Sequence, residues 1–171
     1  MSLITYQKQQ AIKPISGNNE DKYDILATEV ENIELGEVLG IDFLQDIQTN
    51  PTSYTDLING STFENCRGNN ITHKGLVYVL AYLIYSKYAS TSKISDTFSG
   101  FVQKNRPDST QLPEGEIRRI QEDNRKVAFH ELEIIKSYLN ANKEIYPLWS
   151  DRFVKVYTPK IKGIKRVNYG R

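Results

Sequence analysis

The sequence predicts a mainly α-helical fold, a small bundle built around one central buried helix at about residues 73–90. The first observation is the run from Leu76 to Tyr85, in which tyrosine hydroxyls are the only polar side-chain groups. A helix that is apolar on every side is enclosed by other protein, and ten residues are too few to cross a bilayer, which takes about 20. The second observation is an amphipathic pattern over about residues 114–142. The third is the length of 171 residues, which suits one domain plus tails.

The N-terminal residues 1–19 are expected to form an extended arm. They contain Pro14, Gly17 and few large apolar residues. A frayed terminus and an arm that becomes ordered on a neighbouring molecule both fit this composition.

Residues 21–50 follow a rough helical period, so we expect helix there. Two glycines, Gly36 and Gly40, interrupt the pattern and divide the helix into two pieces. Asp42 is a candidate N-cap of the second piece, residues 43–48.

The chain between this region and the central helix is short and polar. A single turn or two of helix is expected over residues 54–58. A loop or short β-hairpin is expected over residues 61–72, with Gly68 near its tip. Thr72 is a candidate N-cap of the central helix.

The central helix has a competing interpretation as a strand, because Val, Ile and Tyr favour sheets. About 16 residues without Gly or Pro are long for a strand and ordinary for a helix. Four tyrosines recur at helical spacing, which agrees with the helix: Tyr78, Tyr82, Tyr85 and Tyr88. The predicted core residues of this helix are Leu76, Leu80, Leu83 and Ile84.

A second connection, residues 91–113, separates the central helix from the long one. It contains a candidate short strand, residues 98–103, with Phe98 and either Phe101 or Val102 turned inward. The fold is therefore expected to hold one short β-hairpin or strand pair.

The long helix, residues 114–142, is expected to pack through its second half. Its predicted core stripe consists of Ala128, Leu132, Ile135 and Leu139. Its first half is mostly polar and is expected to project or to contact another chain. Tyr146 and Pro147 end the helical region, and Leu148 and Trp149 are expected to form an apolar clasp.

Charge divides the chain in two. Residues 152–171 hold seven Lys or Arg and no acidic residue, whereas residues 1–151 carry a net charge of −6. We therefore expect three parts: an N-terminal arm at 1–19, a helical domain at 20–150 and a basic C-terminal arm at 151–171.

The sequence contains no motif that indicates catalysis, a cofactor or a metal site. It has neither phosphate-binding loop, GxxxxGKS/T or GxGxxG, nor a GxSxG nucleophile elbow. Cys66, His73 and His130 match no familiar zinc spacing, and one cysteine cannot form an internal disulfide. No signal peptide or transmembrane segment is visible, so we expect a soluble non-enzymatic protein made in a cytoplasm.

The basic C-terminal arm allows three interpretations. It can contact nucleic acid, with lysines on phosphates and tyrosines stacking on bases. It can instead dock on an acidic protein surface, or it can be disordered. The alternating apolar residues favour docking, and the candidate docking residues are Phe153, Val156, Tyr157, Lys160, Ile161, Lys162, Ile164, Lys165 and Arg166.

A set of turn and packing residues recurs in a recognisable order over about residues 21–149. The set comprises Leu39-Gly40, Tyr54-x-x-Leu57-x-x-Gly60, Gly75-Leu76, Ala81-Tyr82, Tyr85-Ser86-Lys87-Tyr88, Gly100-Phe101-Val102-x-Lys104, Tyr138-Leu139 and Tyr146-Pro147-Leu148. This order resembles the head–tail connector, or adaptor, proteins of tailed bacteriophages, especially those of crAss-like phages.

The resemblance implies a virion structural protein at the head–tail junction, made in the cytoplasm of a bacterial host. Such proteins form a ring, commonly of twelve copies, that docks on the portal protein and meets the next tail or ring protein. Genomic DNA passes through the ring during ejection without sequence-specific binding, and an acidic lining would repel it. The alternative function is a phage DNA-binding or packaging accessory protein that uses the basic arm.

Overall fold

The computed structural model describes residues 2–15, 20–65, 67–91, 94–97, 100–103 and 112–150. Helices predominate in these residues, as the sequence predicted. The order of elements is α1 (Tyr6–Ile12), α2 (Glu20–Val30), η1 (Glu31–Leu35), α3 (Gly36–Leu39), α4 (Ile41–Thr49), η2 (Pro51–Tyr54), α5 (Thr55–Asn59), β1 (Ser61–Glu64), β2 (Asn70–His73), α6 (Leu76–Thr91), β3 (Ile94–Thr97), β4 (Gly100–Gln103) and α7 (Glu114–Ala141).

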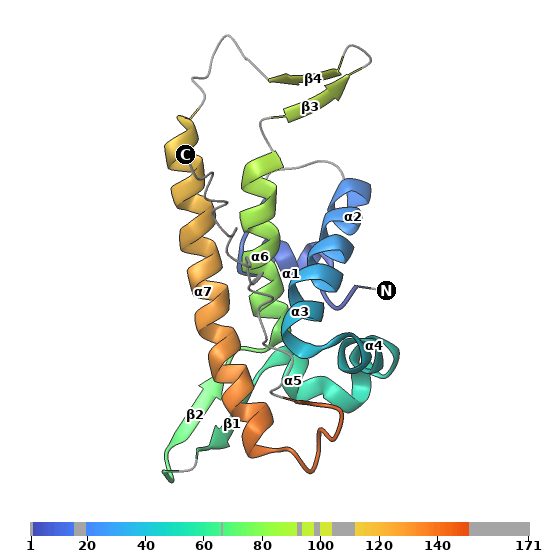
Figure 1. The fold of residues 1–171 in the computed structure, drawn as a ribbon, viewed down its shortest axis with the longest axis vertical. Helices are drawn as coiled ribbons and strands as arrows, with labels where there is room; N and C mark the ends of the chain where they lie inside the picture. The colour runs from blue at the N-terminus through green and yellow to red at the C-terminus, as the bar shows by residue number, and fades with distance from the viewer. Residues whose placement is uncertain are drawn as a thin grey trace, which may run out of the picture.

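Helix α6 is the centre of the fold. In Figure 1 it stands between α7 on one side and the α1 and α2 helices on the other. Eight of its side chains are buried, and they lie all around the helix except along the tyrosine row. The seven residues predicted to form the core are all buried: Leu76, Leu80, Leu83, Ile84, Leu132, Ile135 and Leu139.

Helix α7 packs along α6 over most of its length (Figure 1). The buried stripe at Ala128, Leu132, Ile135 and Leu139 is the one that the sequence predicted. The first half of α7 lies beside α6 from Gln121 onward and does not project there, whereas most of residues 114–119 are exposed; a contact of this part with another chain stays a prediction. Polar contacts hold the part beside α6, because Ser86 Oγ on α6 donates to the Gln121 carbonyl at 3.1 Å.

The region predicted as two helical pieces contains one continuous rod followed by a second helix. Helix α2 passes through the π-helical turn η1 into α3 without a break, so Gly36 does not interrupt it. The chain turns at Gly40 (φ 86°), which is also the N-cap of α4. Asp42 therefore lies in the first turn of α4 and is not its cap, because the helix begins at Ile41.

Strands β1 and β2 form the expected hairpin, with Ser61 opposite His73 and Glu64 opposite Asn70. Thr72 belongs to β2 and bonds Thr62 across the hairpin (Oγ1–Oγ1 2.8 Å), so it does not cap α6. A second hairpin joins β3 to β4. Strand β4 falls within the predicted strand at 98–103, whereas β3 was not predicted; the inward orientation proposed for Phe98, Phe101 or Val102 lies outside the described side chains.

The hairpin is joined to α5 and α6 at a close backbone crossing. Gly60 ends α5 and Gly75 precedes α6, both with positive φ (99° and 84°). A Cβ on Gly60 would lie 2.5 Å from the His73 carbonyl oxygen, and one on Gly75 would meet the Ile58 carbonyl and the Gly60 nitrogen. Only glycine combines this approach with this backbone conformation.

Residues 2–15 correct the expected N-terminal arm, because they hold helix α1 and are packed on the body. Thr5 caps α1, and Ile4, Gln9 and Ile15 are buried. Gln9 Nε2 donates to the Ala81 carbonyl of α6 at 3.1 Å. These residues therefore belong to the domain; residues 16–19 and 151–171 lie outside the described residues.

Candidate assembly surface

The residues that the sequence nominated for partner docking, Phe153 to Arg166, lie outside the described part of the chain. The structure does describe the point from which they start. The last described residues, 142–150, fold back from the end of α7 toward α4 and α5 (Figure 1). The contacts of residues 142–150 therefore decide where the C-terminal arm begins.

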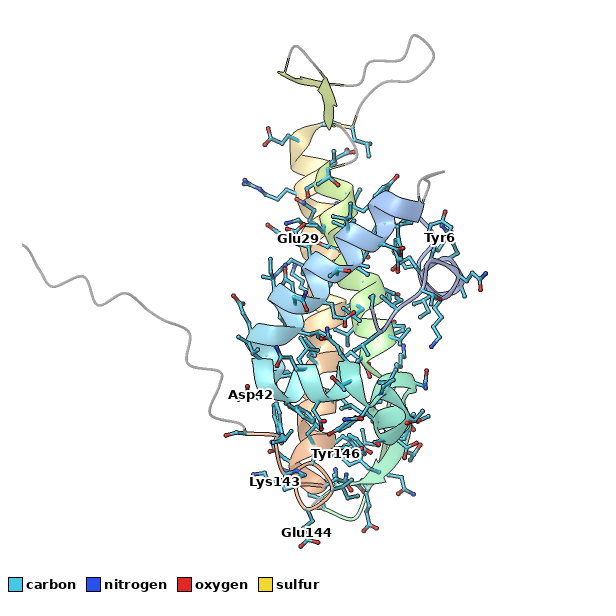
Figure 2. All side chains as sticks on the ribbon, turned by 90° about the vertical axis from the view of Figure 1, so that its right-hand side faces the viewer. Tyr6, Glu29, Asp42, Lys143, Glu144 and Tyr146 are labelled. Atoms are coloured by element: carbon cyan, nitrogen blue, oxygen red, sulfur yellow. The ribbon has the colours of Figure 1, made fainter. Side chains whose placement is uncertain are left out.

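The anchor of these residues is an aromatic cluster. Tyr146 stacks on Tyr54 with centroids 5.8 Å apart, and its hydroxyl bonds the Tyr138 hydroxyl at 2.8 Å. Trp149 lies 6.3 Å from the Phe43 ring of α4. Figure 2 shows Tyr146 inside the lower end of the bundle, below α4. These rings fix the chain up to residue 149 against α4.

The prediction of an apolar clasp at Leu148 and Trp149 holds for Trp149 but not for Leu148. Trp149 is buried, and its Nε1 donates to Asn140 Oδ1 at 3.1 Å. Leu148 points outward and is 48% exposed. The sequence indicated the clasp through its composition alone; the ring partners Phe43 and Tyr54 are about 100 residues away, and no local spacing shows them.

The titratable groups of this cluster are held in one protonation state. Burial, together with the hydrogen bond to Asp46, raises the pKa of Tyr54 to about 12. The same hydrogen bond, with one from Asn50, lowers the pKa of the Asp46 carboxyl. Burial and the hydrogen bond with Tyr138 raise the pKa of Tyr146. These groups therefore serve as structural hydrogen-bond partners near neutral pH.

The segment from α2 to β1, which includes α4 beside the anchor, is rich in acidic residues. Residues 20–65, which build α2 to β1, contain eleven Asp or Glu and a single base, Lys22. Two ion pairs connect this layer to the central helices. Glu29 pairs with Lys87 of α6 at 3.0 Å, and Glu34 accepts two hydrogen bonds from Arg125 of α7 at 2.6 and 3.0 Å.

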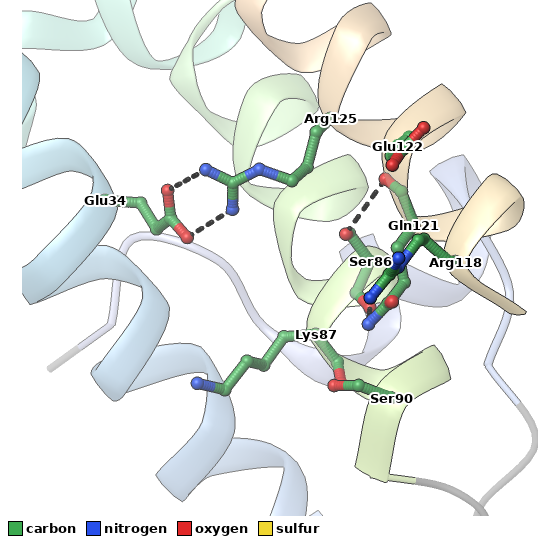
Figure 3. Close-up of a pocket in the computed structure, with 8 residues that line it drawn as sticks. All are labelled: Glu34, Ser86, Lys87, Ser90, Arg118, Gln121, Glu122 and Arg125. Carbon is green, nitrogen blue, oxygen red and sulfur yellow. Dashed lines mark hydrogen bonds and ion pairs between the residues drawn. The ribbon is translucent and has the colours of Figure 1, made fainter. Parts of the chain in front are cut away.

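A cavity of about 260 Å³ lies next to these pairs, between η1, α6 and α7. Figure 3 shows the Glu34–Arg125 pair at one edge and the Ser86–Gln121 bond at the other. The walls carry both signs of charge, and Arg118 and Glu122 complete them. Within the cavity Glu34 pairs with Arg125, and Lys87 pairs with Glu29 outside it, so these contacts hold η1, α6 and α7 together around the cavity.

The predicted tyrosine row forms a half-buried seam on α6. Tyr78 and Tyr82 have centroids 4.8 Å apart, and their hydrogen bond raises the pKa of Tyr82. Lysines lie over the row at its N-terminal end and in its middle. Lys74 Nζ lies 4.3 Å from the Tyr78 centroid, and Lys13 Nζ of the N-terminal segment lies 4.7 Å from that of Tyr85.

The histidine considered as a metal ligand has a structural position. His73 is buried, with its ring 4.4 Å from Tyr138 and its Nε2 3.0 Å from Ser61 Oγ. Burial lowers its pKa, against the opposing effect of Glu131 and Asp56. His130 is exposed on α7, and Cys66 lies outside the described residues. Within the described ranges no cluster of His, Cys, Asp or Glu is arranged to hold a metal ion.

The described part of the chain contains no helix with both the length and the apolar character needed to cross a membrane. Its fold defines a small helical domain with an acidic segment at residues 20–65 and an aromatic anchor at its C-terminal end. The chain belongs to the family of unknown function DUF6712, whose model matches residues 35–152. Searches of curated proteins and of solved structures found no match.

Proposed function

We propose that this chain is a virion structural protein, a ring-forming connector that docks on a phage portal protein and links it to the tail. The ring extends the DNA channel, and DNA passes through it during ejection. In this proposal the protein resides at the head–tail junction, is made in the bacterial host cytoplasm, and carries out no catalysis.

The observation that carries the proposal is the position of the residues on which the resemblance to connectors depends. Gly40 makes the turn between α3 and α4, and Gly60 and Gly75 make the backbone crossing. Tyr54, Tyr138 and Tyr146 form the aromatic anchor. These residues determine the path of the chain in this protein, and the proposal expects connector proteins to keep the same residues at the same turns.

The division of charge gives independent support. A ring subunit needs one surface that attracts a neighbour and another that leaves DNA free. The acidic layer of residues 20–65 repels phosphate, whereas the basic residues 152–171 are attracted to acidic protein. The anchor at Trp149 places the start of that arm beside α4.

The direct test is the mass of the purified protein with and without the portal protein encoded in the same genome. The proposal expects a ring-sized species, commonly of twelve copies, that forms or becomes stable on the portal. Native mass spectrometry and electron microscopy of the mixture would show it. A monomer at all concentrations that never binds the portal would contradict the proposal.

The alternative function, a DNA-binding or packaging accessory protein, is favoured by the seven basic residues of 152–171. It predicts binding to duplex DNA that weakens steeply as salt increases. Replacement of Lys160, Lys162, Lys165 and Arg166 by Ala would abolish that binding. The connector proposal expects this variant to lose assembly with little change in DNA affinity.

A further inference from the structure

Exposed side chains recur at every fourth position along the rod formed by α2, η1 and α3 and at the start of α4. They are Ile25, Glu29, Ile33, Glu37 and Ile41, which we name the isoleucine ridge. Its three isoleucines are 70%, 53% and 67% exposed. Figure 2 shows α2, α3 and α4 on the face turned toward the viewer, with Glu29 and Asp42 on the same side of it.

The apolar part of the ridge has no cover in the described structure. One exposed isoleucine needs no explanation, but two on the rod and a third at the start of α4, at regular spacing along the chain, indicate a contact surface. The rest of the same helices is packed normally, since Ala27, Val30, Leu35 and Leu39 are all buried. The residues of the ridge on the rod therefore lie away from the side that the core occupies.

Acidic groups surround these isoleucines. Asp24, Glu37 and Asp42 are exposed, and they form no ion pair with any residue in the described ranges. Of the two glutamates in the ridge, Glu29 is paired, with Lys87. The ridge thus combines apolar contacts with negative charge, and it fits a segment that has apolar residues between positive charges.

The chain itself contains such a segment outside the described structure. Residues 153–167 carry five Lys or Arg and no acid. Ile161, Ile164 and Val167 recur at every third residue, and Lys162, Lys165 and Arg166 stand between them. The segment is therefore basic where the ridge is acidic, and both carry apolar residues at regular spacing.

The chain that follows residue 150 is long enough to make this contact. The described chain reaches residue 150 directly after Trp149, which packs on Phe43 of α4, two residues from Ile41. From there 21 residues remain, and an extended chain covers about 3.3 Å per residue. On the rod the ridge from Ile25 to Glu37 is about 18 Å long at helical rise, and Ile41 follows directly after the turn at Gly40. The arm is therefore long enough to leave its own subunit and lie along the ridge of another.

We propose that the isoleucine ridge of one copy binds residues 153–167 of the next copy. This inference rests on the proposed ring function, because each subunit then has one ridge and one arm. A contact between different surfaces of identical subunits closes into a ring when the rotation permits it. Electrostatic attraction selects the arm as partner, and the isoleucines hold it by burying apolar area.

Site-directed crosslinking in the full-length chain tests the contact. One Cys66→Ser protein carries Ile33→Cys in the ridge, and a second carries Ile161→Cys in the arm. On mixing with a mild oxidant, the raised local concentration at a docked site should form the disulfide dimer at least about tenfold faster than free collision. The matched control replaces the ridge cysteine by Glu133→Cys, an exposed position on α7. Equal rates for the two pairs would overturn the proposal.

Charge reversal gives a second readout in the same assay. Either Glu37→Lys with Asp42→Lys in the ridge protein or Lys162→Glu with Lys165→Glu in the arm protein should reduce the rate to that of the Glu133→Cys control. Combining the reversed ridge with the reversed arm should restore it. No effect of either reversal would count against the charge complementarity on which the contact depends.

A single chain that carries both cysteines shows whether the arm binds the ridge of another copy or the ridge of its own chain. Docking on the next copy produces a ladder of linked subunits on a denaturing gel. Crosslinked monomer as the sole product would overturn the assignment to a second copy. If crosslinking succeeds but no ring forms on the portal, the proposed function fails while the contact stands. If the charge-reversed ridge variant still forms a ring of unchanged mass, the contact fails while the proposed function stands.

Discussion

A side chain on Gly75 would collide with the backbone nitrogen of Gly60, because the two glycines lie backbone to backbone where the hairpin leaves α5 and returns to α6. Gly75→Ala should therefore destabilise the fold through both strain at positive φ and collision. We expect a loss of about 3 kcal/mol or more in the free energy of unfolding. Urea unfolding followed by circular dichroism measures it.

Substitutions at two other glycines distinguish backbone strain at positive φ from the collision of an added Cβ. Gly68 also has positive φ (78°), but among the described residues an added Cβ there meets only Glu64 Oε1, at 3.6 Å. Gly68→Ala should cost about 1 kcal/mol from strain alone. An added Cβ on Gly115 meets no described atom within 4 Å, so Gly115→Ala should stabilise α7 by up to about 1 kcal/mol. Equal effects at all three positions would refute the crossing as the cause.

Glu31 connects the N-terminal segment to the rod and to α4. Its buried carboxylate accepts hydrogen bonds from Ser2 Oγ (2.7 Å), the Leu3 amide (2.9 Å) and Gln48 Nε2 (2.7 Å). Glu31→Ala leaves these three donors without their acceptor, so the free energy of unfolding should fall by about 2–4 kcal/mol. The exposed Glu37→Ala should change it by less than about 0.5 kcal/mol. Hydrogen exchange should show faster opening of α1 in the Glu31 variant only.

Acid should weaken the fold through His73. Its pKa is lowered in the folded state by burial, so below the ordinary value of 6.5 the unfolded chain binds a proton that the folded chain does not. The contribution is fully present above pH 6.5 and is lost as the pH falls toward the lowered value. The opposing groups are Glu131 on α7 and Asp56 on α5.

The measurement is the slope of unfolding free energy against pH between 7 and 5, in wild type and variants. His73→Gln should flatten this slope, whatever its effect on absolute stability. His130→Gln is the matched control, because His130 is exposed on α7 and its replacement should leave the slope unchanged. A slope that is the same in all three proteins would assign the acid sensitivity to carboxylates.

The main helices were predictable because their signals are local. A run of ten residues without a charged group places α6 in the interior, and the 3.6-residue period of Leu132, Ile135 and Leu139 marks the inner face of α7. Both signals hold wherever the rest of the chain goes. The glycines at 36 and 40 were harder, since only Gly40 has the positive φ that makes a turn.

The features that sequence reasoning missed depend on contacts between distant residues. Helix α1 has seven residues and a mostly polar sequence, and it is held by Gln9, whose partner Ala81 is 72 positions away. Glu31 is buried although acids are usually exposed, because its three donors come from the N-terminus and α4. The isoleucine ridge was also missed, since its residues read as part of an ordinary amphipathic helix until the structure shows which face is outside.

Trp149 joins stability to assembly, and two changes at this position separate the two roles. Trp149→Ala removes a buried ring that contacts Phe43 and Asn140, so the free energy of unfolding should fall by about 3 kcal/mol. Ending the chain after Trp149 should leave stability within about 0.5 kcal/mol of wild type, since every core residue of the described chain lies at or before this position.

Assembly should respond in the opposite order. The truncated chain lacks the whole basic arm, so it should remain monomeric by light scattering at concentrations where the full chain associates. Trp149→Ala keeps the arm but releases its first residues from α4, which lowers the effective concentration of the arm near the neighbouring subunit. It should therefore associate more weakly than wild type but more strongly than the truncated chain. Unimpaired association of the truncated protein would remove the arm from the interface and leave the body surfaces to form it.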